Sequence, residues 1–286
     1  VKSDSKLSTE AATIAWQEYF QKYEINGSDS SDKTAAAKQA REKLMQQAKY
    51  IDNYKGIIED KRQTAILYAT AGTYKKNSFE YNNLLKTQYD LSQIIDADVQ
   101  LSNGLWLEKL YKNNYIHLLT LITCVYTVYM FFSERKNGLY HIVHTGQSGR
   151  GVLFVKRSII LLIQAVVTNV ALYTESAVML LNRYDGVKDL NVAAVSDEYF
   201  ILTSGKLSRI QFLGLIILLS ILANVVLSLV LWAILLCFGN VNIGLFFYCC
   251  ICVADVVIYK VISAKSILQI FKYLNVYYLF FPNKAA

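Results

Sequence analysis

The chain has 286 residues, of which 54% are apolar or aromatic, and it carries a formal net charge of +7. Its charges are unevenly placed: residues 1–112 hold 16 Lys and Arg against 15 Asp and Glu, whereas residues 113–286 hold 13 against 7. This division excludes a single globular domain and indicates a polar region joined to a membrane region. The basic excess lies beside apolar segments, which argues against nucleic acid as a partner.

The polar region, residues 1–112, has helical patterning over 8–25, 33–71 and 73–112, with a turn-forming cluster at 26–32. It contains no His and no Cys, and its carboxylates are scattered over charged faces. We therefore expect a helical hairpin or short bundle without a catalytic site.

Residues 113–286 contain four long apolar segments that we predict to be membrane-spanning helices. Each approaches or exceeds the roughly 20 residues that cross a bilayer, and a backbone in lipid must be helical to satisfy its own polar groups. A shorter aromatic segment, 264–282, is predicted to be interfacial or re-entrant. The four predicted spans are about 115–132, 158–181, 210–238 and 241–262.

The connecting loops predict the orientation. The loop 133–157 carries five Lys and Arg and a single acid, whereas the loop 182–209 carries four of each sign. Because cytoplasmic loops are enriched in basic residues, we place 133–157 in the cytoplasm and, by alternation, 1–112 outside the cell. The predicted fold is all-α, a polytopic membrane helix bundle with a helical extracellular insertion. Carrying a polar front region across the membrane would require a further span upstream.

Metal binding is not expected. The CC-x-C run of the last predicted span has no accompanying His or carboxylate ligand, so its cysteines should pack against lipid or helices. His141 and His144 share a helical spacing, but no carboxylate is placed to complete a site. The five cysteines all lie in apolar segments: Cys124, Cys237, Cys249, Cys250 and Cys252.

The loop 133–157 carries the most informative pattern. It is long enough for a short amphipathic helix beneath the membrane, whose charged ends would meet a cytoplasmic protein or anionic lipid; an ordinary basic loop that only fixes topology is the alternative. A span ending in E-x-x-x-G-L, then T-x-x-x-G-R, then a Lys before the next span, resembles the membrane subunit of ABC-2-type transporters from Gram-positive bacteria. The residues in these positions are Glu134, Gly138, Leu139, Thr145, Gly149, Arg150 and Lys156.

The resemblance extends over about residues 98–280, through the stretches 98–112, 189–207 and 266–275. It implies a six-span subunit of which the four predicted spans are the second to fifth, with 1–112 as an extracellular insertion. It also implies that the loop 133–157 docks on a separate ATPase subunit, and that a second membrane subunit, identical or different, completes the transporter in the bacterial cell membrane. The chain has no G-x-x-x-x-G-K-[ST] phosphate loop, so ATP and Mg²⁺ would be bound by the partner, and no cofactor is expected in this chain.

Five polar residues inside the predicted spans are candidates for a translocation path, because polar groups in hydrocarbon usually face a bundle interior or a cavity. The amides among them could instead join helices by hydrogen bonds, and the two carboxylates could lie near the outer interface at little cost. The five are Gln164, Asn169, Glu175, Asn224 and Asp255.

The sequence thus favours a transport subunit that is not itself an enzyme, an exporter driven by alternating access. Two other classes remain. A membrane-anchored receptor or scaffold would bind its partner through the extracellular helical domain and would work without an ATPase. A membrane enzyme would need a catalytic constellation, for which only His117, His141 and His144 are available.

Overall fold

The structure, a computed structural model, describes residues 42, 45–101, 104–133, 149–184, 186–201, 205–238 and 240–261. These residues are helices and their connections, and the single β-type contact among them is an antiparallel bridge between Ala193 and Ser208. The prediction of an all-α chain is confirmed at this level. The chain divides into two compact units, Val1–Gly104 with Gly186–Phe212, and Leu105–Asp185 with Leu213–Ala286. The predicted helix over 8–25 and the segment 264–282 lie outside the described residues.

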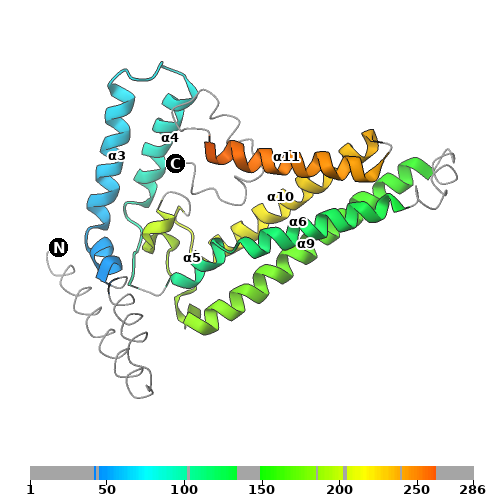
Figure 1. Cartoon of the computed structure of the whole chain (residues 1–286). Coiled ribbons are helices and arrows are strands. Elements are labelled where there is room, and N and C mark those ends of the chain that lie inside the picture. Colours follow the sequence, from blue (N-terminus) through cyan, green and yellow to red (C-terminus); the bar gives the residue numbers. More distant parts are fainter. Residues whose placement is uncertain are drawn as a thin grey trace. The chain divides into compact units, whose positions relative to one another are not determined.

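In the first unit, α3 (Tyr54–Thr70) and α4 (Phe79–Ile94) form an antiparallel hairpin (Figure 1). Their connection needs two residues with positive φ, Gly72 at 69° and Asn77 at 66°, and glycine and asparagine are the residues that adopt this conformation most readily. Ser78 then caps α4, since its side chain accepts a hydrogen bond from the Tyr81 N–H at 3.2 Å.

The hairpin is closed by residues 186–212, which contain the short 3-10 helices η1 (Gly186–Asp189), η2 (Ala194–Ser196) and η3 (Glu198–Phe200). Tyr50 donates from its hydroxyl to the Val195 carbonyl at 2.8 Å, and burial raises its pKa above the ordinary range, which keeps the donor proton in place. The apolar core of this unit joins both segments: Tyr50, Tyr54, Ile58, Leu91, Ile94, Val195 and Ile201.

A buried ion pair anchors the same segment. The Arg209 side chain is fully buried, and its Nη2 donates to Asp197 Oδ2 at 3.2 Å while Nη1 lies 4.0 Å from Asp189. The Asp197 carboxylate also accepts from Gln47 at 3.4 Å. Gly104 comes so close that an added Cβ would lie 1.7 Å from Asp197 Oδ2. Removing one member of such a pair leaves a buried charge uncompensated, so residues 186–209 and the hairpin depend on it.

Among the described residues, four helices are long and apolar enough to cross a membrane, as expected for a multi-pass membrane protein, and most of their length lies in the second unit. The first is α5 (Leu105–Tyr111) continued by α6 (Asn114–Phe131), and the others are α9 (Gly149–Tyr184), α10 (Arg209–Cys237) and α11 (Val241–Val261). The helices α10 and α11 match the predicted spans within a residue or two. The other two spans begin earlier than predicted: the first starts at Leu105, ten residues before 115, and α9 starts nine residues before 158. Its 36 residues extend about 54 Å, well beyond the ~30 Å of hydrocarbon.

We predict that Gly104→Ala weakens the first unit by about 1–3 kcal/mol, because the new methyl group displaces the Asp197 carboxylate from Arg209. The matched control is Gly56→Ala in α3, where an added Cβ meets nothing within 4 Å; this change should be neutral or stabilise by up to about 1 kcal/mol. Limited proteolysis of the detergent-purified chain, with sites mapped to 45–104 and 186–212, measures the difference. Equal protection of both variants would contradict the role given to the ion pair.

Candidate functional site

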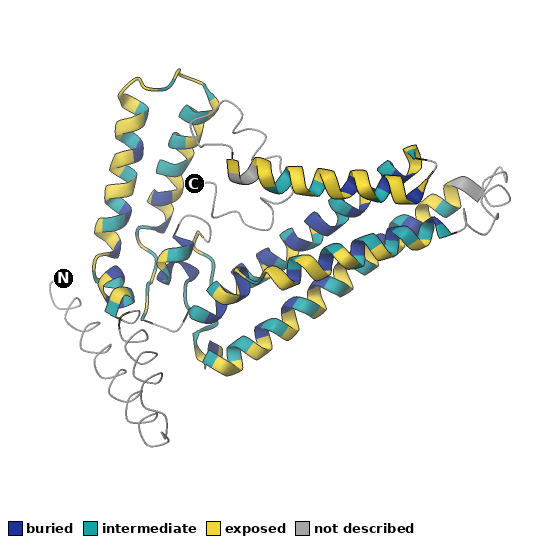
Figure 2. Ribbon diagram, viewed as in Figure 1, coloured by how far each residue is buried: buried dark blue, intermediate teal, exposed yellow. Residues whose placement is uncertain are grey.

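The inward face of α9 is a narrow stripe. Its buried residues recur every fourth position, which is the spacing of one helix face: Arg157, Leu161, Ala165, Asn169, Tyr173 and Ala177. About half of the intervening residues are apolar and exposed, which suits them to contact lipid, and the exposed positions of α9 are yellow in Figure 2. Asn169 is therefore placed inside the helix assembly by the same periodicity that buries its apolar neighbours.

Around Asn169, a polar layer joins α6, α9 and α10. We call Thr120, Asn169 and Ser220 the outer polar layer, because it is the layer farther from the ends of α6 and α9 that flank the loop 134–148. Ser220 donates from Oγ to Asn169 Oδ1 at 2.6 Å, and the Thr120 hydroxyl donates to the same oxygen at 3.4 Å. The Asn169 amide group donates in turn to the Ala165 carbonyl at 2.8 Å. All of these side chains are fully or almost fully buried, so the layer is a dry interhelical network.

A second polar layer lies further along the same helices and reaches α11. Ser228 Oγ is 3.1 Å from Cys124 Sγ and 3.3 Å from Asn224 Oδ1, and can donate its one proton to either. The Cys124 sulfur is also 3.8 Å from the Tyr248 hydroxyl. This inner polar layer, defined as Cys124, Asn224, Ser228 and Tyr248, links α6, α10 and α11. Gln164 donates to Thr123 at 3.1 Å and so adds a bond between α9 and α6.

Two buried amide atoms have no hydrogen-bond partner among the described residues: Asn224 Nδ2 and Gln164 Oε1. An amide group left unpaired in an apolar environment costs about 1–3 kcal/mol by mutational data. Such a cost is expected where a polar group meets water or a ligand in another state of the protein.

The five predicted path residues fall into different environments. Asn169 and Asn224 are fully buried and Gln164 is half-buried, and all three face the interhelical region described above. Asp255 is half-buried on α11. Glu175 is exposed on α9, on the side that carries the exposed apolar residues.

The predicted coupling loop is only partly described. Glu134, Gly138, Leu139 and Thr145 lie outside the described residues. Lys156 is exposed on α9. Gly149 and Arg150 belong to the first turn of α9, and only their backbone is described.

Sequence reasoning missed several members of the two layers. Thr120 and Cys124 are four residues apart on α6, and Ser220, Asn224 and Ser228 are spaced alike on α10. This spacing indicates one polar face on each helix. Single hydroxyl and thiol groups are common in membrane spans, however, so each residue alone did not predict an interhelical contact. Nothing in the sequence indicated that Tyr248 would join them.

No three His, Cys, Asp or Glu side chains gather as metal ligands within the described part of the chain. Comparison with protein-family models, with curated proteins and with solved structures gives no match to this chain.

We predict that Asn169→Leu lowers the stability of the membrane unit by about 1–2 kcal/mol, because it removes the acceptor for Ser220 and Thr120 within a dry interface. Unfolding in a titration with SDS, followed by circular dichroism, measures the change. Thr174→Ala, an exposed position of the same helix, is the control and should shift stability by less than about 0.5 kcal/mol. An equal midpoint for the two variants would contradict the placement of Asn169.

Proposed function

We propose that the chain is the membrane-spanning subunit of an ABC-type exporter in a bacterial cell membrane, driven by a separate ATPase subunit through alternating access. ATP and Mg²⁺ belong to that partner, and a second membrane subunit completes the assembly. The observation that carries the proposal is the pair of polar layers buried between the apolar helices. Helix association alone explains the hydrogen-bonded members of these layers. The amide atoms that lack a partner among the described residues, Asn224 Nδ2 and Gln164 Oε1, add nothing to that association, whereas a translocation path requires polar groups at membrane depth.

The arrangement of the first unit supports the proposed orientation. Residues 45–104 and 186–212 share one apolar core and one buried ion pair, so they must lie on the same side of the membrane. Two candidate spans, Leu105–Phe131 and Gly151–Tyr184, separate them along the chain, and an even number of crossings returns the chain to the same side. With the basic loop 133–157 in the cytoplasm, this side is extracellular.

The length of α9 supports a mechanical role for the loop. Because the helix is longer than the bilayer is thick, its first turns, with Lys156 and the backbone of Gly149 and Arg150, extend past the hydrocarbon on the loop side. Closure of the ATPase partners against residues 134–148 would push on the end of a continuous helix. That helix carries Gln164 and Asn169, so the displacement reaches the polar layers.

A membrane-anchored receptor or scaffold is the second candidate. The observation that favours it is a set of exposed large apolar side chains on the hairpin, which a binding partner could cover. This function would need no ATPase and no movement of α9. The exposed residues are Leu67, Tyr68, Phe79, Leu85 and Tyr89.

Thiol labelling tests the orientation. In a chain whose native cysteines are replaced by alanine, we expect Lys76→Cys, an exposed position beside the α3–α4 turn, to react with a membrane-impermeant maleimide in intact cells. Ser148→Cys, in the basic loop, should react only after permeabilisation. Labelling of Ser148→Cys alone from outside would contradict this orientation and place the loop 133–157 outside the cell.

The coupling role has its own test. The double change Glu134→Ala with Arg150→Ala should reduce the ATPase subunit retained with the tagged chain about tenfold or more, since losing a charged contact at an interface costs on the order of 2 kcal/mol or more. The control is Lys86→Ala with Asp90→Ala, which removes the same two charges from exposed positions of α4. Full retention of the ATPase in the first double variant would exclude these two residues from the coupling surface.

A further inference from the structure

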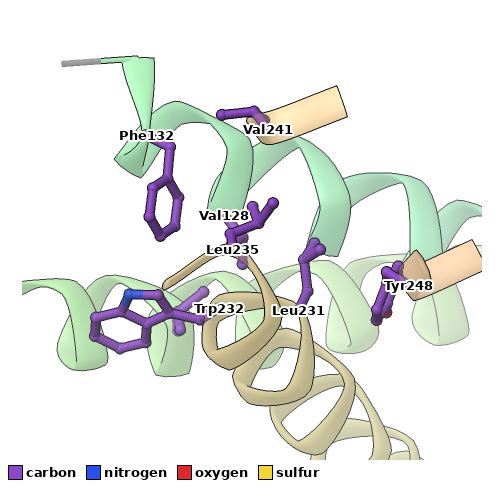
Figure 3. Packing of buried hydrophobic residues seen from close by; sticks show 8 residues of the cluster. Val128, Phe132, Leu231, Trp232, Leu235, Val241 and Tyr248 are labelled. Carbon is purple, nitrogen blue, oxygen red and sulfur yellow. The ribbon is translucent and has the colours of Figure 1, made fainter. Parts of the chain in front are cut away.

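An apolar cluster closes the membrane unit at the end where the loop 134–148 connects α6 to α9 (Figure 3). It includes the residue that follows α6, Phe132, the last turns of α10 and the first residue of α11, Val241. We call it the apolar plug. Its buried members are Val128, Phe132, Leu161, Leu231, Trp232, Leu235, Val241 and Tyr248.

Trp232 connects the plug to both ends of that loop. Its ring stacks on Phe154 of α9 with centroids 5.3 Å apart, and meets Phe131 of α6 at 5.9 Å. The Arg157 guanidinium lies over the Phe131 ring at 5.4 Å, an attractive contact between a cation and an aromatic face. One α10 side chain is therefore held between the helix that enters the loop and the helix that leaves it.

The inner polar layer begins directly behind the plug. Cys124 lies about two turns of α6 from Phe132, or roughly 12 Å, and Asn224 lies two turns of α10 from Leu231, which belongs to the plug. Tyr248 belongs to both, with its ring in the plug and its hydroxyl near Cys124. Among the described residues, the apolar plug therefore lies between the inner polar layer, with its unpaired Asn224 amide, and the loop end.

We propose that the apolar plug is the cytoplasmic gate of the path, with Trp232 as the side chain through which the loop operates it. This inference rests on the proposed function for its direction and its energy source. Apolar constrictions exclude water and ions until they widen. Displacement of the first turns of α9 moves Phe154 and Arg157 together, which withdraws the contacts on Trp232 and Phe131. Water then reaches the inner polar layer and hydrates the Asn224 amide, offsetting the cost of opening.

Cys124 is a native reporter for this gate, because it is fully buried immediately behind the plug. The experiment uses the full chain with Cys237, Cys249, Cys250 and Cys252 replaced by alanine, in inverted membrane vesicles. A membrane-impermeant methanethiosulfonate reagent is applied from the cytoplasmic face. We expect Trp232→Ala to raise the rate of Cys124 modification about tenfold or more, because the plug loses its largest side chain. Phe154→Ala should also raise the rate of Cys124 modification. Because Phe154 is exposed, this change should be tolerated, and it provides the test if Trp232→Ala does not fold.

Phe246→Ala is the matched control, since Phe246 is an exposed aromatic residue of α11 outside the plug. Its Cys124 should react as slowly as that of the parent chain. Unchanged modification in both Trp232→Ala and Phe154→Ala would overturn the gate, as would an equal rise in Phe246→Ala or faster reaction from the outer face. The assay needs no ATPase, so its result is independent of the proposed function. If the plug variants speed Cys124 modification but the chain binds no ATPase, the gate is supported and the proposed function is contradicted.

Discussion

Hydrocarbon offers no hydrogen bonds, and this constraint determines how the spanning helices of this chain can meet. The buried Asn169 is placed against Ser220 and Thr120 from two other helices. Lipid-facing positions accept almost any apolar residue, whereas these few polar contacts fix the rotation and register of α6, α9 and α10. That register also determines which residues of α6 and α10 face the inner polar layer and the apolar plug.

With the register fixed, the inward faces of α6 and α10 have the same order of environments. Moving toward the loop end, the outer polar layer is followed by the inner polar layer and then by the apolar plug. Trp232 lies in the plug and also contacts Phe131 and Phe154, the residues that flank the loop. In the proposed gate, a push on the loop would reach the polar interior through these packed aromatic rings.

The spans were predictable because length and apolar content alone determine them. The early start of α9 was not, since Gly149, Gly151 and the basic residues of its first turns resemble a loop; the structure covers Arg157 with the Phe131 ring and continues the helix. The union of the hairpin with residues 186–212 was also hidden, because it rests on long-range contacts such as Tyr50 with Val195 and Arg209 with Asp197. Of the interior, the amides were visible in the sequence, whereas Thr120, Ser220 and Ser228 became significant only through their partners.

The central claim is that this chain transmits the work of a separate ATPase across a membrane. The most direct measurement is ATP hydrolysis by the complex purified through a tag on the full chain from its own membranes, with the subunits identified by mass spectrometry. The account predicts that hydrolysis purifies with the chain, together with a subunit that carries the phosphate-loop motif this chain lacks. An intact chain that purifies with no such subunit and no hydrolysis would contradict it.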